Sequence, residues 1–490
     1  MPAHFLEAFV LISALALLMF EAFIPSRHKT LIAIGSIGVL VFSLVLLFFA
    51  KAPDPTNSEM ARFYAWDASA KFFKGFTLLA GILTLALGLD YRKALSKFTA
   101  NPESEDGTGE YYCLILLATA GMMWMASAKD LVSLFVSLEL STITFYILVA
   151  YMRRNVGSLE AGVKFLILGA LSTGFLVYGI SWLYGASGST ELSAIGASIT
   201  EANSTYLLFG LALILVSLAF KVGAVPLHLW IPDVYQGSPT PTTSFLSIAS
   251  KASGFAISLR VLEPFLNSPV THDKTVTILS ILAGATILVG NLAAIPQTNF
   301  KRLLAYSSIA NAGFILLALA AWDKGSDLTS AQIVGFYLAI YLIMTFAAFF
   351  ILSTIHRNTG SEEISAFEGL GTRNPFLALM TTVVMAAMAG VPLTAGFYGK
   401  FFSFEAGVQA SLWVPISIGF IGVAAGFYYY FQIIRAMYWR KSFDESPIKV
   451  RPLSLYVLIT LTSLLIILGF FPQPILWLLQ AASNFGNSPP

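Results

Sequence analysis

The chain has 490 residues, of which 57% are hydrophobic and 11% are charged, and its formal net charge is +2. Soluble domains carry about 25% charged residues, so this composition indicates an integral membrane protein and excludes a soluble enzyme. The small net charge gives no reason to expect a nucleic-acid partner, and the single cysteine, Cys113, excludes a disulfide framework or a cysteine-ligated iron–sulfur cluster.

Long apolar runs predict an all-α fold. At about 20 residues per span, the sequence predicts about 14 transmembrane helices; the first is a retained span because the N-terminus lacks a basic region and a cleavage site. A polar loop at 91–109, holding Pro102, Glu103, Glu105 and Asp106, follows the third span. The spans are expected near residues 3–24, 31–50, 70–90, 110–127, 130–151, 159–185, 205–235, 241–264, 274–296, 301–322, 330–355, 375–408, 411–438 and 454–480.

Two predicted spans are overlong, and proline interrupts each of them. The span at 205–235 contains Ala-Val-Pro-Leu around Pro226, and the span at 375–408 contains Gly-Val-Pro-Leu around Pro392. Each is the fourth of a block of five helices, and blocks with an odd number of spans enter the membrane from opposite sides. This is the inverted-repeat plan of many transporters, in which sites lie at broken helices near the midplane. Both prolines can also be read as ordinary kinks.

The repeats divide the chain into four parts. We expect an N-terminal three-helix segment with its loop at 1–109, a first repeat at 110–265, a second repeat at 273–440 and a C-terminal helix at 441–490.

Basic residues in the loops predict the orientation of the chain. They concentrate on alternating loops, which by the positive-inside rule are cytoplasmic, so both termini are expected on the outer side. This set comprises Arg27, Lys29, Arg92, Lys93, Lys97, Arg153, Arg154, Lys301, Arg302, Arg357, Arg373, Arg440, Lys441, Lys449 and Arg451. The opposite loops hold mainly Lys51, Arg62, Lys129, Lys274 and Lys324.

Charged residues also fall inside the predicted spans, where such groups are costly and usually functional. Glu139 lies about nine residues into its helix, a depth of ~14 Å, and Lys221 and Lys251 fall at a similar depth near the midplane. Lys164 is shallower, in the cytoplasmic third of its span. Lys400 follows the second helix break and belongs to the outer half.

Burial predicts what these groups do. Low polarity favours a neutral lysine, and a nearby carboxylate favours a charged one. Moving Glu139 relative to Lys221 is therefore expected to switch Lys221 between holding and releasing a proton. Lys251 is expected to receive that proton through ordered water, and Lys400 to pass it out. Lysine suits this chemistry because arginine stays charged when buried.

Each of these residues also has a structural interpretation. Lys164 can extend to the cytoplasmic interface, and Glu139 and Lys221 can form a static ion pair that clamps two helices. His228, the sole histidine within a predicted span, is counted among the proton-translocating residues, but it can also simply cap the broken helix through a backbone bond. Asp130 begins a helix, where a carboxylate stabilises the positive end of the helix dipole, so it is interpreted as structural.

Four stretches resemble one known family. Residues 110–151, 220–255, 299–314 (NFKRLLAYSSIANAGF) and 389–402 (AGVPLTAGFYGKFF) are similar to the antiporter-like membrane subunits of respiratory complex I, the NADH–quinone oxidoreductase. Residues 158–185 are similar to one branch of that family in particular. The resemblance extends over nearly the whole chain.

The resemblance implies a proton channel driven by electron transfer elsewhere in the complex. It pairs Glu139 with Lys221 and assigns proton-carrying roles to Lys164, Lys251 and Lys400. It also implies a bacterial inner membrane, neighbouring membrane subunits called K and M, and FMN, iron–sulfur clusters and quinone held by partner subunits. This chain itself is expected to hold no cofactor, since its histidines lack metal-ligand spacing and no nucleotide fingerprint occurs.

One departure from the family concerns its tenth helix. Many relatives have a histidine where this chain has Asn311. Asparagine orients water but carries no proton at neutral pH, so water or Tyr306 is expected to bridge there. Three other functions stay open: a subunit of a multisubunit cation/proton antiporter, a subunit of an energy-converting hydrogenase, and a membrane scaffold whose charges only hold helices together.

Overall fold

A computed structural model describes residues 2–25, 28–53, 58–99, 107–322, 328–442 and 446–480, and in these residues the chain is helical without a β-strand. It forms two compact units. Unit 1 holds the chain up to Gly223 and Gly237–Ile278, and unit 2 holds Ala224–Gln236 and Leu279–Ala481. The unit boundary therefore falls at the first predicted helix break.

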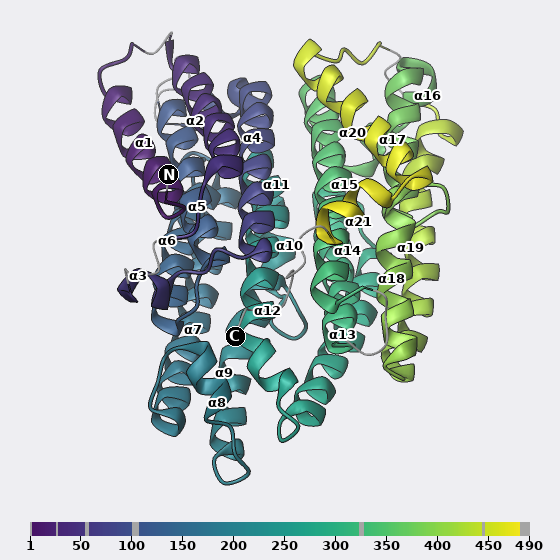
Figure 1. Cartoon of the computed structure of the whole chain (residues 1–490). Coiled ribbons are helices and arrows are strands. Elements are labelled where there is room, and N and C mark those ends of the chain that lie inside the picture. The colour runs from purple at the N-terminus through teal and green to yellow at the C-terminus, as the bar shows by residue number, and fades with distance from the viewer. Residues whose placement is uncertain are drawn as a thin grey trace. The chain divides into compact units, whose positions relative to one another are not determined.

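Unit 1 is a bundle in which α7 packs against α9, and α5 packs against α1, α4 and α6 (Figure 1). The continuous segment formed by α11, η2 and α12 is largely buried, whereas fewer than a third of the residues in the apolar windows of α2 and α7 are buried. Its helices are α1 Phe5–Glu21, α2 Thr30–Phe49, α3 Ser58–Phe63, α4 Ala68–Ser96, α5 Thr108–Ala126, α6 Leu131–Val149, α7 Val156–Ser187, α8 Leu192–Ala197, α9 Ser204–Val222, α11 Thr240–Phe245, the π-helix η2 Leu246–Ser250 and α12 Lys251–Asn267.

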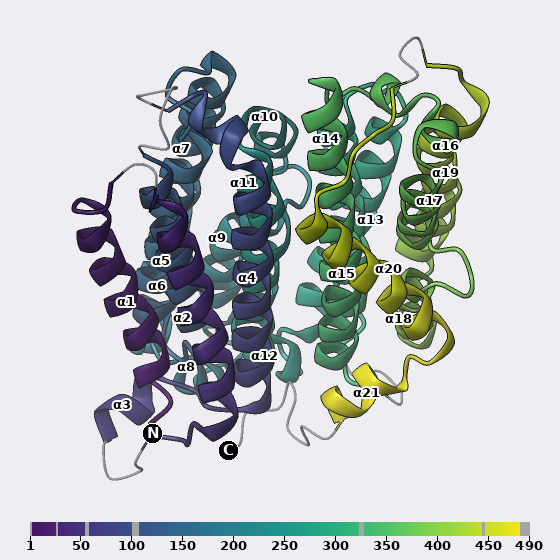
Figure 2. The same cartoon turned by 90° about the horizontal axis from the view of Figure 1, so that it is seen from above.

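Unit 2 is built around α15, which contacts α14, α17, α18 and α20 (Figure 2). Its helices are α10 Trp230–Gly237, α13 His272–Ala294 (which begins in unit 1), α14 Phe300–Ala320, α15 Ser330–Thr359, the 3₁₀ helix η3 Ile364–Phe367, α16 Leu370–Arg373, α17 Pro375–Ala389, α18 Ala395–Gln409, α19 Trp413–Trp439, α20 Pro452–Phe470 and α21 Gln473–Gln480.

Helix ends follow local sequence signals. The Asn155 side chain caps α7 by accepting the N–H of Gly157 at 2.9 Å. Thr329 and Gln332 form a capping box at the start of α15. Both signals are preferred because a side-chain oxygen accepts an otherwise unbonded N–H of the first helical turn.

Helices occur in each of the regions expected to span the membrane, but the number of spans stays a prediction. In the described residues, 11 helices are long and apolar enough to cross a bilayer. The 17-residue α1, α5 and the halves α17 and α18 are not among them. Pro102, Glu103, Glu105 and Asp106 of the predicted loop, with Arg27 and Lys324 of the basic-residue pattern, lie outside the described residues.

Candidate functional site

Both predicted helix breaks exist, and in each the first helix ends with the same glycine geometry. The first helix ends at Gly223 (φ 79°) and the second at Gly390 (φ 87°), a conformation that favours glycine. The N–H groups of these glycines donate to Ala219 O at 2.9 Å and to Ala386 O at 3.0 Å. Seven residues of non-helical or turn structure, 223–229, separate α9 from α10 (Trp230–Gly237), so the predicted single span at 205–235 is two helices of different units.

Lys221 is the first predicted site residue, and it is buried in unit 1 near the end of α9. Its side chain is held by α6: Nζ donates to Thr142 Oγ1 at 2.9 Å and to Ser141 Oγ at 3.5 Å. The ammonium also lies 5.9 Å from the centre of the Phe145 ring. These two hydroxyls offset part of the cost of burying the ammonium, and among the described residues no ion pair with Lys221 is formed.

Glu139 lies on the same helix that holds Lys221 but faces another partner. Thr173 Oγ1, on α7, donates to Glu139 Oε1 at 2.8 Å. Among the described residues of unit 1, no ion pair joins Glu139 to Lys221. The static ion pair is therefore not formed, and each of the two groups is instead bonded to a threonine hydroxyl.

Lys251 follows directly after the π-helical turn η2 and is 2% exposed. The sequence does not signal this turn, which adds a residue to the helix and is frequent at functional sites. One helical turn beyond Lys251, Gly254 packs on Lys221: a Cβ at Gly254 would lie 3.1 Å from Lys221 Cγ. The structure thus brings α12, with Lys251, against the stem of Lys221.

Lys400 belongs to unit 2, where it binds the end of the helix before the break. Its Nζ donates to Met388 O at 3.0 Å and to Ala389 O at 2.8 Å, the last carbonyls of α17. The ammonium lies 5.6 Å from the centre of the Phe314 ring. A cation at this place satisfies carbonyls that the interrupted helix leaves unbonded and stabilises its negative end.

Lys164 and His228 are more exposed than the three buried lysines. The side chain of Lys164 is 44% exposed on α7 and pairs with Glu160 at 2.8 Å. His228 is half-buried in unit 2, and its carbonyl accepts the N–H of Ile231 at 2.9 Å, where α10 begins. The backbone of His228 thus takes part in restarting the helix.

A polar network surrounds Asn311 in unit 2. The Tyr337 hydroxyl donates to Asn311 Oδ1 at 2.7 Å, and Asn311 Nδ2 donates to Ser307 O at 2.8 Å. Ser307 Oγ also shares a hydrogen bond with the Tyr430 hydroxyl. The tyrosine that donates to Asn311 is Tyr337, and a bridge through water or Tyr306 stays a prediction. The Tyr337 ring packs on Gly399, beside Lys400, where an added Cβ would lie 3.1 Å from it.

The sequence interpretation also missed buried charges near the N-terminal segment. Lys74 Nζ lies 2.6 Å from Glu7 Oε1, and both side chains are at most 1% exposed. Arg260, on α12, forms two bonds of 2.9 Å with Asp67. Lys74 and Arg260 stand within predicted spans, so the rule that marked Lys221 also applies to them. In the described residues, no cluster of His, Cys, Asp or Glu could hold a metal ion.

The close packing of the second break gives a prediction. A Cβ at Gly396 would lie 1.8 Å from Ala387 O, a backbone atom that cannot move aside alone. We expect Gly396→Ala to destabilise unit 2 by the upper part of ~1–3 kcal/mol, the usual range for overpacking. Abundance and thermal midpoint of the purified assembly measure this. Gly426→Ala is the control, since its nearest atom would be 3.7 Å away; equal stability of the two variants would contradict the packing described.

Helices interrupted at glycines, with charged groups buried beside the breaks, define a multi-pass membrane protein of the transporter type. The family model described as NADH:quinone oxidoreductase/Mrp antiporter, transmembrane, matches residues 128–426. The chain belongs to this family, in the group of NADH-quinone oxidoreductase subunit N, as the relatives below establish.

The relatives are similar over most of their length. Identity is 38% over 447 residues with NADH-quinone oxidoreductase subunit N of Heliobacterium modesticaldum, covering 91% of this chain and 90% of that one. It is 41% over 415 residues with subunit N of Moorella thermoacetica, covering 84% of each. The predicted resemblance is confirmed.

Chains of solved respiratory complexes are also similar to this chain. A chain of respiratory complex I from Thermus thermophilus with bound aureothin is 32% identical, with a TM-score of 0.79, covering 96% of this chain and 98% of that one. A chain of the membrane-bound sulfane sulfur reductase, an archaeal respiratory complex, is 26% identical, with a TM-score of 0.83, covering 98% and 97%.

Proposed function

We propose that the chain is a proton-translocating membrane subunit of an NADH–quinone oxidoreductase, in which electron transfer in partner subunits drives protons through Glu139, Lys221, Lys251 and Lys400. The observation that carries the proposal is that three lysines, Lys221, Lys251 and Lys400, are buried at interrupted or π-helical turns, and that Lys221 and Lys400 donate to hydroxyl and carbonyl oxygens. Burying such charges within the membrane costs free energy, and buried charges of this kind usually mark ion or proton paths.

The first step is proposed to be a movement of Glu139. Its carboxylate is held by Thr173, while Lys221 is held by Thr142, one turn along the same helix. Moving a carboxylate from ~8 Å to ~4 Å from an ammonium changes their interaction by about 2 kcal/mol at an effective dielectric constant of 20. Breaking the Thr173 bond would therefore favour the protonated form of Lys221, and remaking it would favour proton release.

The later steps follow the packing within each unit. Lys251 receives the proton from Lys221 because α12 packs on the Lys221 stem at Gly254. Lys400 acts in unit 2 as the release group. Lys164 is proposed to act at the exposed face of α7, and His228 to assist at the restarted helix.

Inverted repeats are proposed from matched backbone pairing. Leu131 N donates to Thr190 O and Leu192 N donates to Lys129 O in unit 1. In unit 2, Phe300 N donates to Glu362 O and Ile364 N to Thr298 O, in the same pattern around the start of an equivalent helix. The basic-residue pattern assigns the two copies to opposite sides of the membrane, as inversion requires.

The proposed assembly is a bacterial inner-membrane complex with both termini of this chain on the periplasmic side. Subunits K and M are proposed as neighbours, and FMN, iron–sulfur clusters and quinone as cofactors of partner subunits. This chain is proposed to contain no redox centre.

A second candidate is a subunit of a cation/proton antiporter or of another energy-converting membrane complex such as a hydrogenase. The 26% identity with the sulfane sulfur reductase chain supports that class of function. The 36–41% identity with several subunits N favours the oxidoreductase. Adjacent genes for flavin and iron–sulfur subunits would decide for the oxidoreductase, and an isolated antiporter operon would decide against it.

The test uses Lys251→Met and Lys400→Met in the complete complex in inverted membrane vesicles. We expect each to lower the rate of NADH-driven proton translocation about tenfold or more, a barrier increase of ~1.4 kcal/mol. Lys71→Met is the control, since Lys71 is exposed on α4. Wild-type translocation in both assembled variants would refute the proposal.

A further inference from the structure

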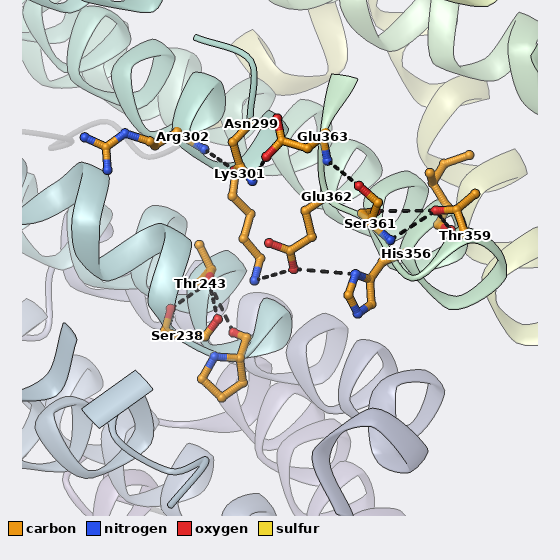
Figure 3. A network of polar contacts seen from close by, with 12 residues as sticks. Ser238, Thr243, Asn299, Lys301, Arg302, His356, Thr359, Ser361, Glu362 and Glu363 are labelled. Carbon is orange, nitrogen blue, oxygen red and sulfur yellow. Dashed lines mark hydrogen bonds and ion pairs between the residues drawn. The ribbon is translucent and has the colours of Figure 1, made fainter. Parts of the chain in front are cut away.

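Three titratable side chains of unit 2 meet at one carboxylate oxygen (Figure 3). Lys301 Nζ lies 2.8 Å from Glu362 Oε1, and His356 Nδ1 lies 3.9 Å from the same oxygen. The side chains of Lys301, Glu362 and His356 are 2%, 16% and 27% exposed, so exposure increases from the lysine to the histidine. We call these three residues the loading cluster.

The loading cluster is fixed at the end of unit 2 where basic residues gather. Lys301 is the second residue of α14, and His356 lies in the last turn of α15. The segment that carries Glu362 is held by Phe300 N, which donates to Glu362 O at 2.8 Å, and by Ile364 N, which donates to Thr298 O at 2.8 Å. The positive-inside rule assigns this end to the cytoplasm, the side from which a pump takes protons.

Several other charged groups at this end bond to partners outside the cluster. None of these bonds involves the Glu362 carboxylate, which lies next to Lys301 and His356. The bonds are Arg302 to Asp233 at 2.8 Å, Asn299 to Glu363 at 3.2 Å, Arg357 to Lys449 O at 2.8 Å and Arg440 to Glu368 at 3.2 Å.

The equivalent place in unit 1 shows that the fold does not need these charges. The backbone pairing Leu131–Thr190 matches Phe300–Glu362, so Val132 stands where unit 2 has Lys301, and Thr190 stands where it has Glu362. The same turn thus forms with an apolar and a hydroxyl side chain. A buried ion pair adds little net stability over neutral residues, so its presence in one copy calls for a function.

Polar side chains recur along α14 beyond the loading cluster. Ser308 is two turns beyond Lys301, ~10 Å at the helical rise, and shares a hydrogen bond of 3.2 Å with the Tyr235 hydroxyl. Asn311 follows one turn later and accepts from Tyr337, whose ring packs beside Lys400. All these residues belong to unit 2.

We propose that Lys301, Glu362 and His356 load protons from the cytoplasm and pass them along α14 toward Lys400, an inference that rests on the proposed function of Lys400. A proton from water binds the His356 imidazole. The imidazolium is drawn to Glu362 Oε1 and weakens its hold on the Lys301 ammonium, which gives a proton to the hydroxyl line. The His356 proton then passes through Glu362 to the Lys301 amine, so one proton has moved inward and both side chains are restored.

The test measures NADH-driven proton translocation in inverted vesicles that carry the complete complex, across external pH 6 to 8. We expect His356→Gln to lower translocation about tenfold, to the level of Lys400→Met, and to flatten the pH profile, since imidazole titrates in this range. The matched control is Arg357→Gln, the adjacent residue of α15, which bonds to Lys449 O and leaves the cluster intact; it should translocate as the wild type.

A second variant guards against loss of folding. Glu362→Gln alone leaves a buried ammonium without its carboxylate, whereas Lys301→Gln with Glu362→Gln keeps a neutral hydrogen-bonding pair. We expect the assembled double variant to translocate as poorly as His356→Gln. If Lys400→Met lowers translocation but His356→Gln and the double variant do not, the cluster is only a clamp and the inference is wrong while the proposed function stands. If Lys400→Met itself translocates as the wild type, both the proposed function of Lys400 and the proton-loading inference are wrong.

Discussion

Replacing Lys221 by methionine is expected to reduce NADH-driven proton translocation at least about tenfold, a barrier increase of ~1.4 kcal/mol, in a complex that still assembles. Methionine fills a similar apolar volume. The hydroxyls that bind Lys221 keep other bonds, because Thr142 Oγ1 donates to Leu138 O at 2.8 Å and Ser141 Oγ donates to Leu138 O at 2.9 Å. The loss should therefore reflect proton transfer, and parallel measurement of assembly and of translocation in vesicles checks it.

Lys221→Arg separates charge from proton exchange at the same position. Arginine keeps a cation for the α6 hydroxyls but does not deprotonate in proteins. We expect this variant to be as defective as Lys221→Met. Normal translocation in Lys221→Arg would mean that the position needs only a fixed positive charge, and the proton hand-over proposed for Lys221 would be wrong.

Arg260→Met is expected to destabilise unit 1 by ~3–5 kcal/mol, the usual effect of removing one partner of a buried ion pair. The Arg260 guanidinium forms two bonds with Asp67 and donates from Nε to Ala126 O at 3.0 Å. Both side chains are at most 11% exposed, so methionine would leave the Asp67 carboxylate uncompensated. Abundance in membranes and the thermal midpoint of the purified complex measure the effect.

The double variant Asp67→Asn with Arg260→Met should recover most of the stability, because no buried charge remains. The asparagine can still accept the Ala70 N–H that Asp67 accepts at 2.7 Å at the start of α4. A double variant no more stable than Arg260→Met would show that packing of the guanidinium, rather than its charge, holds α12.

The Asp67–Arg260 pair also has a defined pH dependence. Burial raises the pKa of the Asp67 carboxyl, but the Arg260 guanidinium and the Ala70 N–H more than offset this, so its pKa lies below the ordinary 3.8. A group with a lowered folded-state pKa contributes stability that is fully present above its unfolded value and is lost as the pH falls through the folded value. The contribution should thus persist at neutral pH and disappear only in acid.

The sequence could predict where helices lie, where two of them break and that Lys221, Lys251 and Lys400 are buried. Apolar runs, a glycine-to-proline break and a charge within an apolar run are local sequence signals. Lys221, Lys251 and Lys400 were found because each is a charge within an apolar run. The partners of these lysines depend on how helices rotate against one another. The bond from Thr173 to Glu139 and the exposure of Lys164 on α7 are of this kind, because rotating α7 would change both without altering any local pattern.

Tertiary contact also explains the residues that the sequence missed. Arg260 stands in a predicted span, yet nothing near it in sequence indicates that Asp67, 193 positions away, would neutralise it. The Tyr337 partner of Asn311 comes from another helix, 26 residues on. The π-turn before Lys251 has no composition signal, since its five residues, LSIAS, suit an ordinary α-helix equally well.

Lys400 donates to the last carbonyls of α17, so its protonation affects the contact between two helices as well as the local charge. The Lys400 ammonium belongs to α18 and is attracted to the negative C-terminal end of α17, so it holds the two half-helices together. A neutral amine is a weaker donor without that charge, so each departing proton would loosen the joint between α17 and α18. The contact would strengthen again when Lys400 is reprotonated. The transported proton would then itself control how firmly the two halves of the broken span are held together.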